Sequence, residues 1–208
     1  MQHSSLETIA ERLSEQLQCE QEDLCLPILH QVTRGKPIEK AALAVSLQVS
    51  QEEAEQRLLH LPDTEFDQQG NILGWGVTLV PTRHRFQIHG QSLYTWCAFD
   101  TVLFPSLLQE TAYVQSICET TGQPISFIAT PEGITDLTPV TSVLSLILPD
   151  ARCDCVRGIF CEQSLFFQSE AAASPWIVLH PEAVLLPIEE AAALGSITAQ
   201  MWPRFSRT

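Results

Sequence analysis

The 208-residue sequence has no long apolar run and few basic residues. Its longest apolar stretches, residues 140–148 and 177–188, are interrupted by Ser, Thr, Pro, His or Glu, which argues against a membrane-spanning helix. The N-terminus, MQHSSLETIAERL, lacks a basic leader followed by an apolar segment, so we expect no signal peptide and a cytoplasmic protein. With 11 Lys and Arg against 25 Asp and Glu, the formal net charge is −14. This charge disfavours binding to nucleic acid or to anionic membrane surfaces.

Several common catalytic motifs are also missing. The sequence has no Gly-rich phosphate loop, no nucleophile elbow and no C-x-x-C redox pair. It lacks the G-x-G-x-x-G motif, which argues against a nicotinamide or flavin enzyme. The six histidines are scattered and form neither an H-E-x-x-H nor an H-x-x-x-H pair. We therefore expect no organic or redox cofactor.

Cysteine is plentiful, by contrast, with seven residues at positions 19, 25, 97, 118, 153, 155 and 161. A reducing cytosol disfavours disulfides, so we expect metal ligands, nucleophiles or core residues among these thiols. Zinc is one candidate for the cluster of Cys153, Cys155 and Cys161. The C-x-C spacing without a nearby fourth ligand fits a structural zinc site poorly. We expect Cys153 and Cys155 to be exposed loop thiols that first capture a soft metal, and Cys118 to pack in the core.

The hydrophobic pattern predicts an α+β fold in two parts. Four helices, over residues 6–17, 24–32, 37–47 and 50–61, come first, and the S-x-x-E sequence at residues 50–53 is a capping box. A strand, a turn and a strand over residues 66–72 follow, then extended segments at residues 74–80 and 85–88 with a turn at Gly90, which completes a winged-helix pattern. We thus predict a winged-helix-like domain over residues 1–90, packed on a domain over residues 91–208 with a small, mainly antiparallel sheet and flanking helices.

The second part is predicted to open with a helix over residues 93–104 that ends at Pro105, followed by a helical stretch at residues 106–110. Short strands and a closing helix complete it. The strands are expected at residues 113–119, 125–130, 143–148, 158–160 and 166–168, and the helix at 188–202.

A winged helix often binds DNA, and a metal-sensing repressor would also carry cysteines. The expected recognition helix, SQEEAEQRLLH, has Glu52, Glu53 and Glu55 against the single Arg57. A helix that contacts DNA should offer hydrogen-bond donors and positive charge. We therefore interpret the first part as a packing domain, and a metal sensor stays a third alternative.

The strongest candidate site combines Cys97, Asp100 and Cys161. On the predicted helix, Cys97 and Asp100 lie three residues apart on one face, among aromatic residues that would dry the site and raise the pKa of the carboxyl. An isolated C-x-x-D is more often a core cysteine beside a solvated carboxylate. Cys161 follows Phe160, and Arg157 would either lower the pKa of this thiol or form a structural ion pair. Two thiols and a protonated carboxyl suit the cleavage of a carbon–metal bond.

Four segments of the sequence resemble the organomercurial lyase, or alkylmercury lyase, family. They are FDQQGNILGWGVTL, LYTWCAFDTVLFP, the C-x-x-T-G-x-P-I-S stretch from Cys118 to Ser126, and the V-R-x-x-F-C…F-F stretch from Val156 to Phe167. The resemblance covers most of the chain in the right order. Where some members have a second cysteine after the one that matches Cys161, this chain has Glu162.

The resemblance implies a function for the thiols. Cys97 and Cys161 would bind mercury, and Asp100 would contact it and transfer a proton to the carbon of R–Hg⁺, which leaves Hg(II) as bound product. Cys118 would be structural. No cofactor is implied; cellular thiols would deliver the organomercurial substrate, and thiols or mercuric reductase would remove Hg(II). The alternative is a non-enzymatic soft-metal carrier, which would bind mercury or copper without releasing hydrocarbon.

Overall fold

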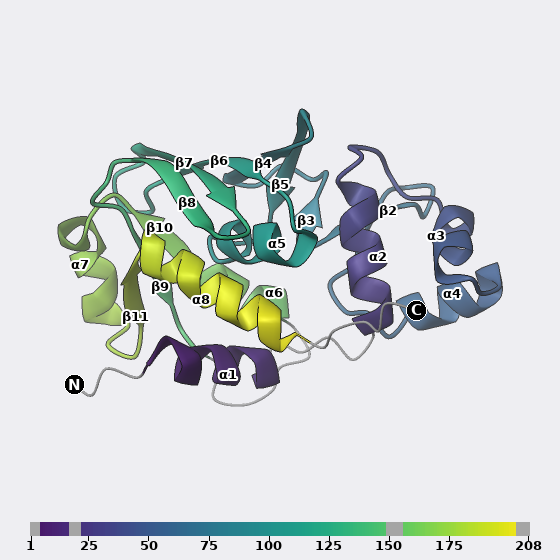
Figure 1. The fold of residues 1–208 in the computed structure, drawn as a ribbon, viewed down its shortest axis with the longest axis horizontal. Helices are drawn as coiled ribbons and strands as arrows, with labels where there is room; N and C mark the ends of the chain where they lie inside the picture. Colours follow the sequence, from purple (N-terminus) through teal and green to yellow (C-terminus); the bar gives the residue numbers. More distant parts are fainter. Residues whose placement is uncertain (1–4, 17–21, 149–155, 203–208) are drawn as a thin grey trace.

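The computed structural model describes residues 5–16, 22–148 and 156–202 (Figure 1). It has an α+β architecture in which a helical N-terminal region precedes antiparallel sheets with helices. The predicted fold class is therefore confirmed. The division at residues 90 and 91 stays a prediction. Among the described helices, none has the length and apolar character that crossing a membrane requires.

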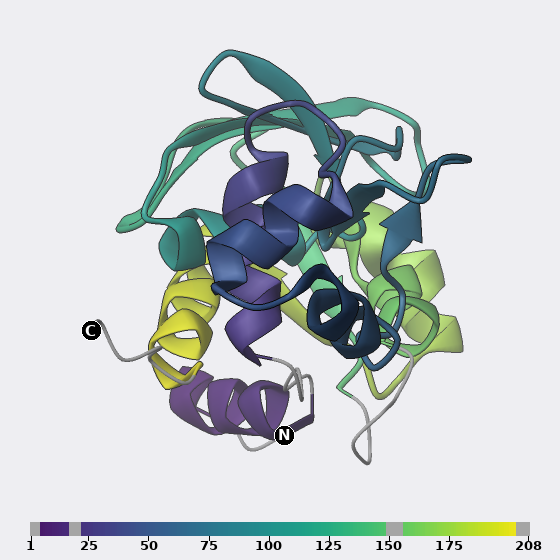
Figure 2. The same ribbon diagram turned by 90° about the vertical axis from the view of Figure 1, so that its right-hand side faces the viewer.

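The N-terminal helices are α1 (Leu6–Gln16), α2 (Glu22–Val32), α3 (Lys40–Leu47) and α4 (Gln51–Leu58). Helix α4 begins as the capping box predicts, because Ser50 Oγ accepts a hydrogen bond from the Glu53 N–H at 3.1 Å. Helix α3 begins later than Pro37, since Ile38 instead pairs with Ile72 through two backbone hydrogen bonds. In Figure 2 the molecule is seen from the side on which α2, α3 and α4 lie. Helix α1 lies apart from them and packs against the C-terminal helix.

One antiparallel sheet of eight strands runs from the N-terminal region into the second part, in the order β1-β2-β3-β5-β4-β6-β7-β8. Its strands are β1 (Glu65–Phe66), β2 (Ile72–Trp75), β3 (Val77–Thr78), β4 (His84–Ile88), β5 (Gln91–Thr95), β6 (Ala112–Ile117), β7 (Pro124–Thr130) and β8 (Gly133–Thr138). Residues on β6 alternate strictly between buried and exposed, as expected when one face of a sheet covers a core. A second sheet has the order β10-β9-β11, with β9 (Val143–Leu146), β10 (Leu165–Phe167) and β11 (Val184–Pro187).

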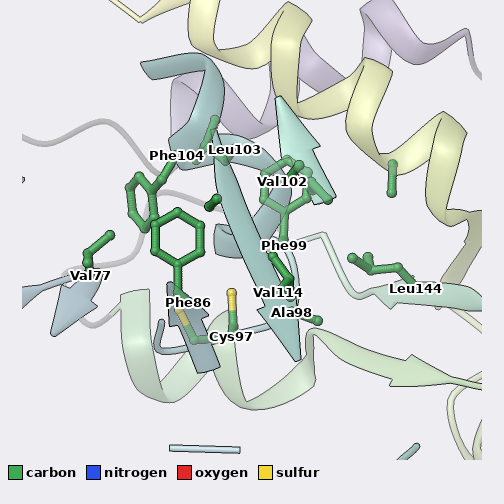
Figure 3. Close-up of a cluster of buried hydrophobic side chains, with 14 of the residues drawn as sticks. Val77, Phe86, Cys97, Ala98, Phe99, Val102, Leu103, Phe104, Val114 and Leu144 are labelled. Carbon is green, nitrogen blue, oxygen red and sulfur yellow. The ribbon is translucent and has the colours of Figure 1, made fainter. Parts of the chain in front are cut away.

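The helices of the second part are α5 (Asp100–Leu108), α6 (Val156–Ile159), α7 (Glu170–Leu179) and α8 (Ile188–Met201). Helices α5 and α8 pack closely at Gly195, where an added Cβ would lie 2.7 Å from the carbonyl oxygen of Val102. Phe99, Val102 and Leu103 are buried in the core beside Phe86 of the large sheet (Figure 3). The core therefore forms around α5, which begins three residues after Cys97.

The predicted helix over residues 93–104 is wrong in its first half. Residues 91–95 form β5, which pairs with β3 and β4, and the helix begins only at Asp100. Leu93 and Thr95 are buried while Tyr94 between them is partly exposed, which is the period of a strand. Pro105 does not end α5, which continues to Leu108, so residues 106–108 are not a separate helix.

Other differences concern short elements. The strand predicted at residues 158–160 is wrong, because residues 156–159 form the short helix α6. The sequence analysis also missed β8, α7 and β11. The remaining predicted strands and the closing helix are present, with boundaries shifted by a few residues.

Candidate active site

The three predicted residues come together at one point of the fold. Cys97 lies between β5 and α5, Asp100 is the first residue of α5, and Cys161 begins a single 3₁₀ turn that follows α6. One ligand atom from each residue, the two Sγ atoms and a carboxylate oxygen, lies within 4.8 Å of the others. Among the described residues, this is the one group of at least three Cys, His, Asp or Glu that is close enough to hold a metal ion. The structure thus brings together every residue that we assigned to the site.

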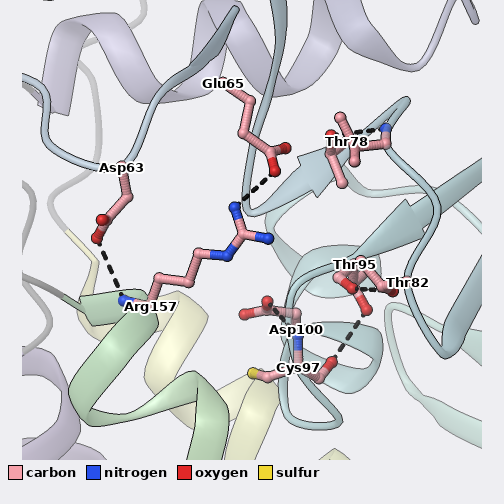
Figure 4. Close-up of polar contacts among 9 residues, drawn as sticks. Asp63, Glu65, Thr78, Thr82, Thr95, Cys97, Asp100 and Arg157 are labelled. Atoms are coloured by element: carbon pink, nitrogen blue, oxygen red, sulfur yellow. Dashed lines mark hydrogen bonds and ion pairs between the residues drawn. The ribbon is translucent and has the colours of Figure 1, made fainter.

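Local hydrogen bonds hold Cys97 and Asp100 in register. The Cys97 N–H donates to Asp100 Oδ2 at 3.1 Å, and Thr95 Oγ1 donates to the Cys97 carbonyl at 2.9 Å (Figure 4). The carboxylate therefore folds back over the turn that carries the thiol. This turn, and not a shared helical face, explains why the C-x-x-D spacing places the two groups side by side.

Ser164 attaches the distant Cys161 segment to this turn. Its hydroxyl accepts a hydrogen bond from the Phe99 N–H at 2.9 Å, and its carbonyl accepts one from the Ala98 N–H at 3.3 Å. The rings of Phe99 and Phe160 meet edge to face with centroids 5.9 Å apart. Two polar contacts and one aromatic contact thus position Cys161 opposite Cys97. Sequence reasoning missed Ser164, since a lone serine beside a strand has no distinctive spacing.

Burial controls the protonation of the three groups. Cys97, Asp100 and Cys161 are 0%, 7% and 5% exposed. Burial raises the pKa of Asp100 to about 7, although hydrogen bonds from Cys97 and the backbone oppose the shift. Burial also raises the pKa of Cys97, and a hydrogen bond with Cys97, together with burial, raises that of Cys161 well above its ordinary value. At neutral pH, therefore, Asp100 can both hold and release a proton between two protonated thiols.

Arg157 forms a structural ion pair near the site. Its Nη1 lies 2.6 Å from Glu65 Oε1, and its backbone N–H donates to Asp63 Oδ2 at 3.2 Å (Figure 4). Its guanidinium carbon also lies 5.3 Å from the centre of the Trp96 ring. Of the two roles that the sequence left open, the ion pair is the one observed. Since the pKa of Cys161 is raised, Arg157 does not convert this thiol to a thiolate.

A polar cleft of about 530 Å³ leads to Cys161, and its lining includes Arg83, His84, Trp96, Arg157 and Glu162. The side chains of Arg83 and Arg157 are 44% and 40% exposed, so the cleft reaches the molecular surface. His84 is itself buried and shares a hydrogen bond with Ser116 Oγ through its Nδ1 at 2.9 Å. The sequence analysis did not predict this cleft, because its walls come from segments that are distant in the chain.

The other cysteines lie apart from this group. Cys118 is buried as predicted, with its Sγ 3.5 Å from Thr120 Oγ1. Burial acts to raise its pKa, but hydrogen bonds from Thr121 and Thr120 outweigh this and lower it to about 7. Cys25 is buried in α2 and disulfide-bonded, which departs from the expectation of reduced thiols. The predictions for Cys19, Cys153 and Cys155 fall outside the described residues.

Comparisons with known proteins agree over residues 7–200. Residues 77–200 match a family model described as alkylmercury lyase, and residues 7–76 match one described as the helix-turn-helix domain of alkylmercury lyase. The chain is similar to the alkylmercury lyase of Pseudomonas putida, with 41% identity over 85% of this chain and 82% of the relative. It is 40% identical to that of Staphylococcus epidermidis over 81% and 78% of the two chains, and 38% identical to that of Streptomyces lividans over the same shares.

A solved structure described as the mercury-bound form of MerB2 has the same fold. Its TM-score is 0.75 at 21% sequence identity, and the match covers 95% of this chain and 98% of that one. At this low identity, the comparison supports the architecture and not the chemistry.

Proposed function

The chain belongs to the alkylmercury lyase family, and from this premise we propose that Cys97, Asp100 and Cys161 cleave the carbon–mercury bond of an organomercurial substrate. The observation that supports this assignment is the convergence of two buried thiols and a carboxyl with a raised pKa within 4.8 Å. Thiolates are the ligands that soft metal ions prefer. The carboxyl supplies the proton that the carbon requires.

The reaction begins with an exchange of thiols at mercury. The substrate arrives as R–Hg–SR′, and Cys97 displaces the carrier thiol, so that the proton of Cys97 leaves with R′SH. Cys161 then adds to mercury as its proton passes to the carboxylate of Asp100. Because the second sulfur donates further electron density, the C–Hg bond weakens and its electron pair takes the proton from Asp100. The products are R–H and Hg(II) held by Cys97 and Cys161, with all protons accounted for.

The raised pKa of Asp100 matters for the last step. An unperturbed aspartic acid, with a pKa of about 3.9, would hold almost no proton at neutral pH. Burial raises the pKa to about 7, so the carboxyl can accept a proton from one thiol and deliver it to carbon. The hydrogen bond from the Cys97 N–H keeps the carboxyl directed towards the metal position. General acid catalysis of this kind needs a pKa near the working pH.

We further propose that cellular thiols deliver the substrate and compete for Hg(II) afterwards, and that mercuric reductase can receive the metal. The polar cleft supports the first part, since it gives a charged ligand a route to Cys161. A cytoplasmic location stays a prediction from the sequence.

The test is headspace gas chromatography of the protein with phenylmercury or methylmercury and excess thiol in D₂O. We expect monodeuterated benzene or methane from the wild type. Cys97→Ser and Cys161→Ser should release none, and Asp100→Asn should bind mercury but release hydrocarbon far more slowly. Cys118→Ser is the matched control, because Cys118 is buried but does not belong to the group. Stoichiometric mercury binding without hydrocarbon from the wild type would instead indicate a soft-metal carrier.

A further inference from the structure

The polar cleft carries charged groups of both signs that the proposed reaction does not use. Arg83, Arg157 and Glu162 line it; the two arginine side chains are 44% and 40% exposed, and Glu162 is exposed as well. The cleft volume of about 530 Å³ lies within the roughly 300–1,000 Å³ that is typical of small-molecule sites. The cleft is therefore large enough for a ligand, and solvent-exposed cations and an anion are available to contact it.

The two arginines keep hydrogen-bond donors for such a ligand. Arg157 pairs with Glu65 through Nη1 at 2.6 Å, and Arg83 pairs with Glu119, also through Nη1. A guanidinium group has five N–H donors, so one carboxylate does not occupy them all. These two carboxylates do offset much of the positive charge, so the cleft does not favour an anion by charge alone.

Glu162 places a negative charge directly beside Cys161. Both residues belong to the 3₁₀ turn Cys161–Gln163, and both line the cleft. A carboxylate only accepts hydrogen bonds, so the group that complements it is a positively charged donor such as an ammonium. A ligand that satisfies both the arginines and Glu162 thus carries a carboxylate and an ammonium group.

We propose that the cleft binds the thiol that removes Hg(II) after cleavage, and that it prefers a thiol built on an α-amino acid. The carboxylate of this thiol contacts Arg83 and Arg157, its ammonium group contacts Glu162, and its sulfur faces Cys161. Cysteine is the simplest such compound. The inference rests on the proposed function and names the chemical class of thiol that acts at that site.

The position of the two cysteines sets the order of the exchange. Cys161 lines the cleft, whereas Cys97 is 0% exposed and does not. The first incoming thiol therefore reaches mercury from the side of Cys161: a new Hg–S bond forms, the bond to Cys161 breaks, and the proton of the incoming thiol passes to Cys161. A second thiol replaces Cys97 in the same way. No electrons are transferred, and both cysteines are again protonated thiols.

The experiment measures how fast four thiols remove mercury from protein loaded with one HgCl₂ per chain. Cysteine carries both charges, N-acetylcysteine only the carboxylate, cysteamine only the ammonium, and 2-mercaptoethanol neither. Protein-bound mercury is followed after rapid desalting, and Cys161→Ser, loaded in the same way, measures the mercury held by other cysteines. Each rate constant is divided by that for 2-mercaptoethanol. The intrinsic reactivity of the thiols cancels when this ratio is compared between a variant and the wild type.

The two charges should be separable. Glu162→Gln should lower the ratios for cysteine and cysteamine by about fivefold, the upper end of what a partly exposed ion pair contributes, and leave the ratio for N-acetylcysteine unchanged. Arg83→Gln should lower the ratios for cysteine and N-acetylcysteine by about the same factor and leave that for cysteamine unchanged. Arg157 is kept, because its substitution would leave the Glu65 carboxylate without a partner.

Arg85→Gln and Glu132→Gln are the matched controls. They remove the same charges from exposed residues that do not line the cleft, so all their ratios should stay near those of the wild type. Ratios for Arg83→Gln and Glu162→Gln that equal those of the controls would overturn the thiol-binding assignment. Absence of hydrocarbon from the wild type would instead overturn the proposed function, since the mercury-loaded protein is prepared without any cleavage.

Discussion

Two buried groups should give this protein opposite dependences of stability on pH. Burial raises the pKa of Asp100 to about 7, and burial, together with the charge of Arg83, lowers the pKa of His84 to about 3. Asp100 is 7% exposed and His84 is 2% exposed. Each group resists ionisation in the folded protein because the interior solvates charge poorly. One is an acid and the other a base, so their effects on unfolding have opposite signs.

The signs follow from the protons bound in each state. The unfolded chain loses the Asp100 proton near pH 3.9, whereas the folded protein keeps it to about pH 7. Between these two pH values, this group therefore makes the free energy of unfolding fall by about 1.4 kcal/mol per pH unit. For His84, the unfolded chain gains a proton as the pH falls below about 6.5, while the folded protein stays neutral to about pH 3. This group makes the free energy of unfolding rise with pH by about the same amount per unit. Between about pH 4.5 and 6 the two contributions cancel.

Removing either group should reveal the other. Asp100→Asn removes the falling contribution, so its free energy of unfolding should rise from pH 4.5 to 6.0 by about 2 kcal/mol more than that of the wild type. His84→Gln removes the rising contribution, so over the same interval its free energy of unfolding should fall by about 2 kcal/mol relative to that of the wild type. The double variant should again follow the wild type. Urea unfolding of all four proteins at the two pH values measures these differences, and other titrating groups cancel in the comparison.

If Asp100→Asn and His84→Gln both followed the wild type, burial would not shift these two groups as argued. The role of Asp100 as a proton store near neutral pH would then lose its physical basis.

Three further predictions concern the packing around the site and the role of Cys118. Gly195→Ala should lower the free energy of unfolding by about 1–3 kcal/mol, since its Cβ would meet the backbone of Val102. Unchanged urea unfolding would mean that α5 and α8 can move apart without loss of stability. Arg157→Gln should lower the free energy of unfolding by about 1–3 kcal/mol, because it leaves the Glu65 carboxylate, whose side chain is 13% exposed, without its partner. Adding Glu65→Gln to this variant should recover part of the loss in the same urea assay. Cys118→Ser should release hydrocarbon as fast as the wild type. A large loss of this activity in a folded variant would mean that Cys118 takes part in the reaction.

The site could be predicted from the sequence although part of the local structure was predicted wrongly. Cys97, Asp100 and Cys161 were chosen from their chemistry and from a family resemblance, which do not depend on secondary structure. The helix predicted over residues 93–104 failed because pairing of β5 with two neighbouring strands outweighed local helical propensity. A turn with an N–H to carboxylate hydrogen bond brings Cys97 and Asp100 together as effectively as a helical face would.

What the sequence could not provide is the set of contacts between distant segments. Ser164 positions Cys161 through hydrogen bonds to Ala98 and Phe99, and Glu65 pairs with Arg157. Neither set of contacts has a characteristic spacing in the sequence, because each joins distant segments that only the fold brings together. The volume of the polar cleft depends in the same way on segments that are distant in the sequence.

The shared eight-stranded sheet limits how this architecture can be modified. The junction of the two matched family models, between residues 76 and 77, falls in the turn that joins β2 to β3, whose residues pair across it. Separating the halves there would expose an open strand edge on each, and such edges promote aggregation. Helix α1 also packs on α8 across the same division. The helix-turn-helix part is thus not an exchangeable module, and a chimera of two relatives would have to replace both partners of each contact together.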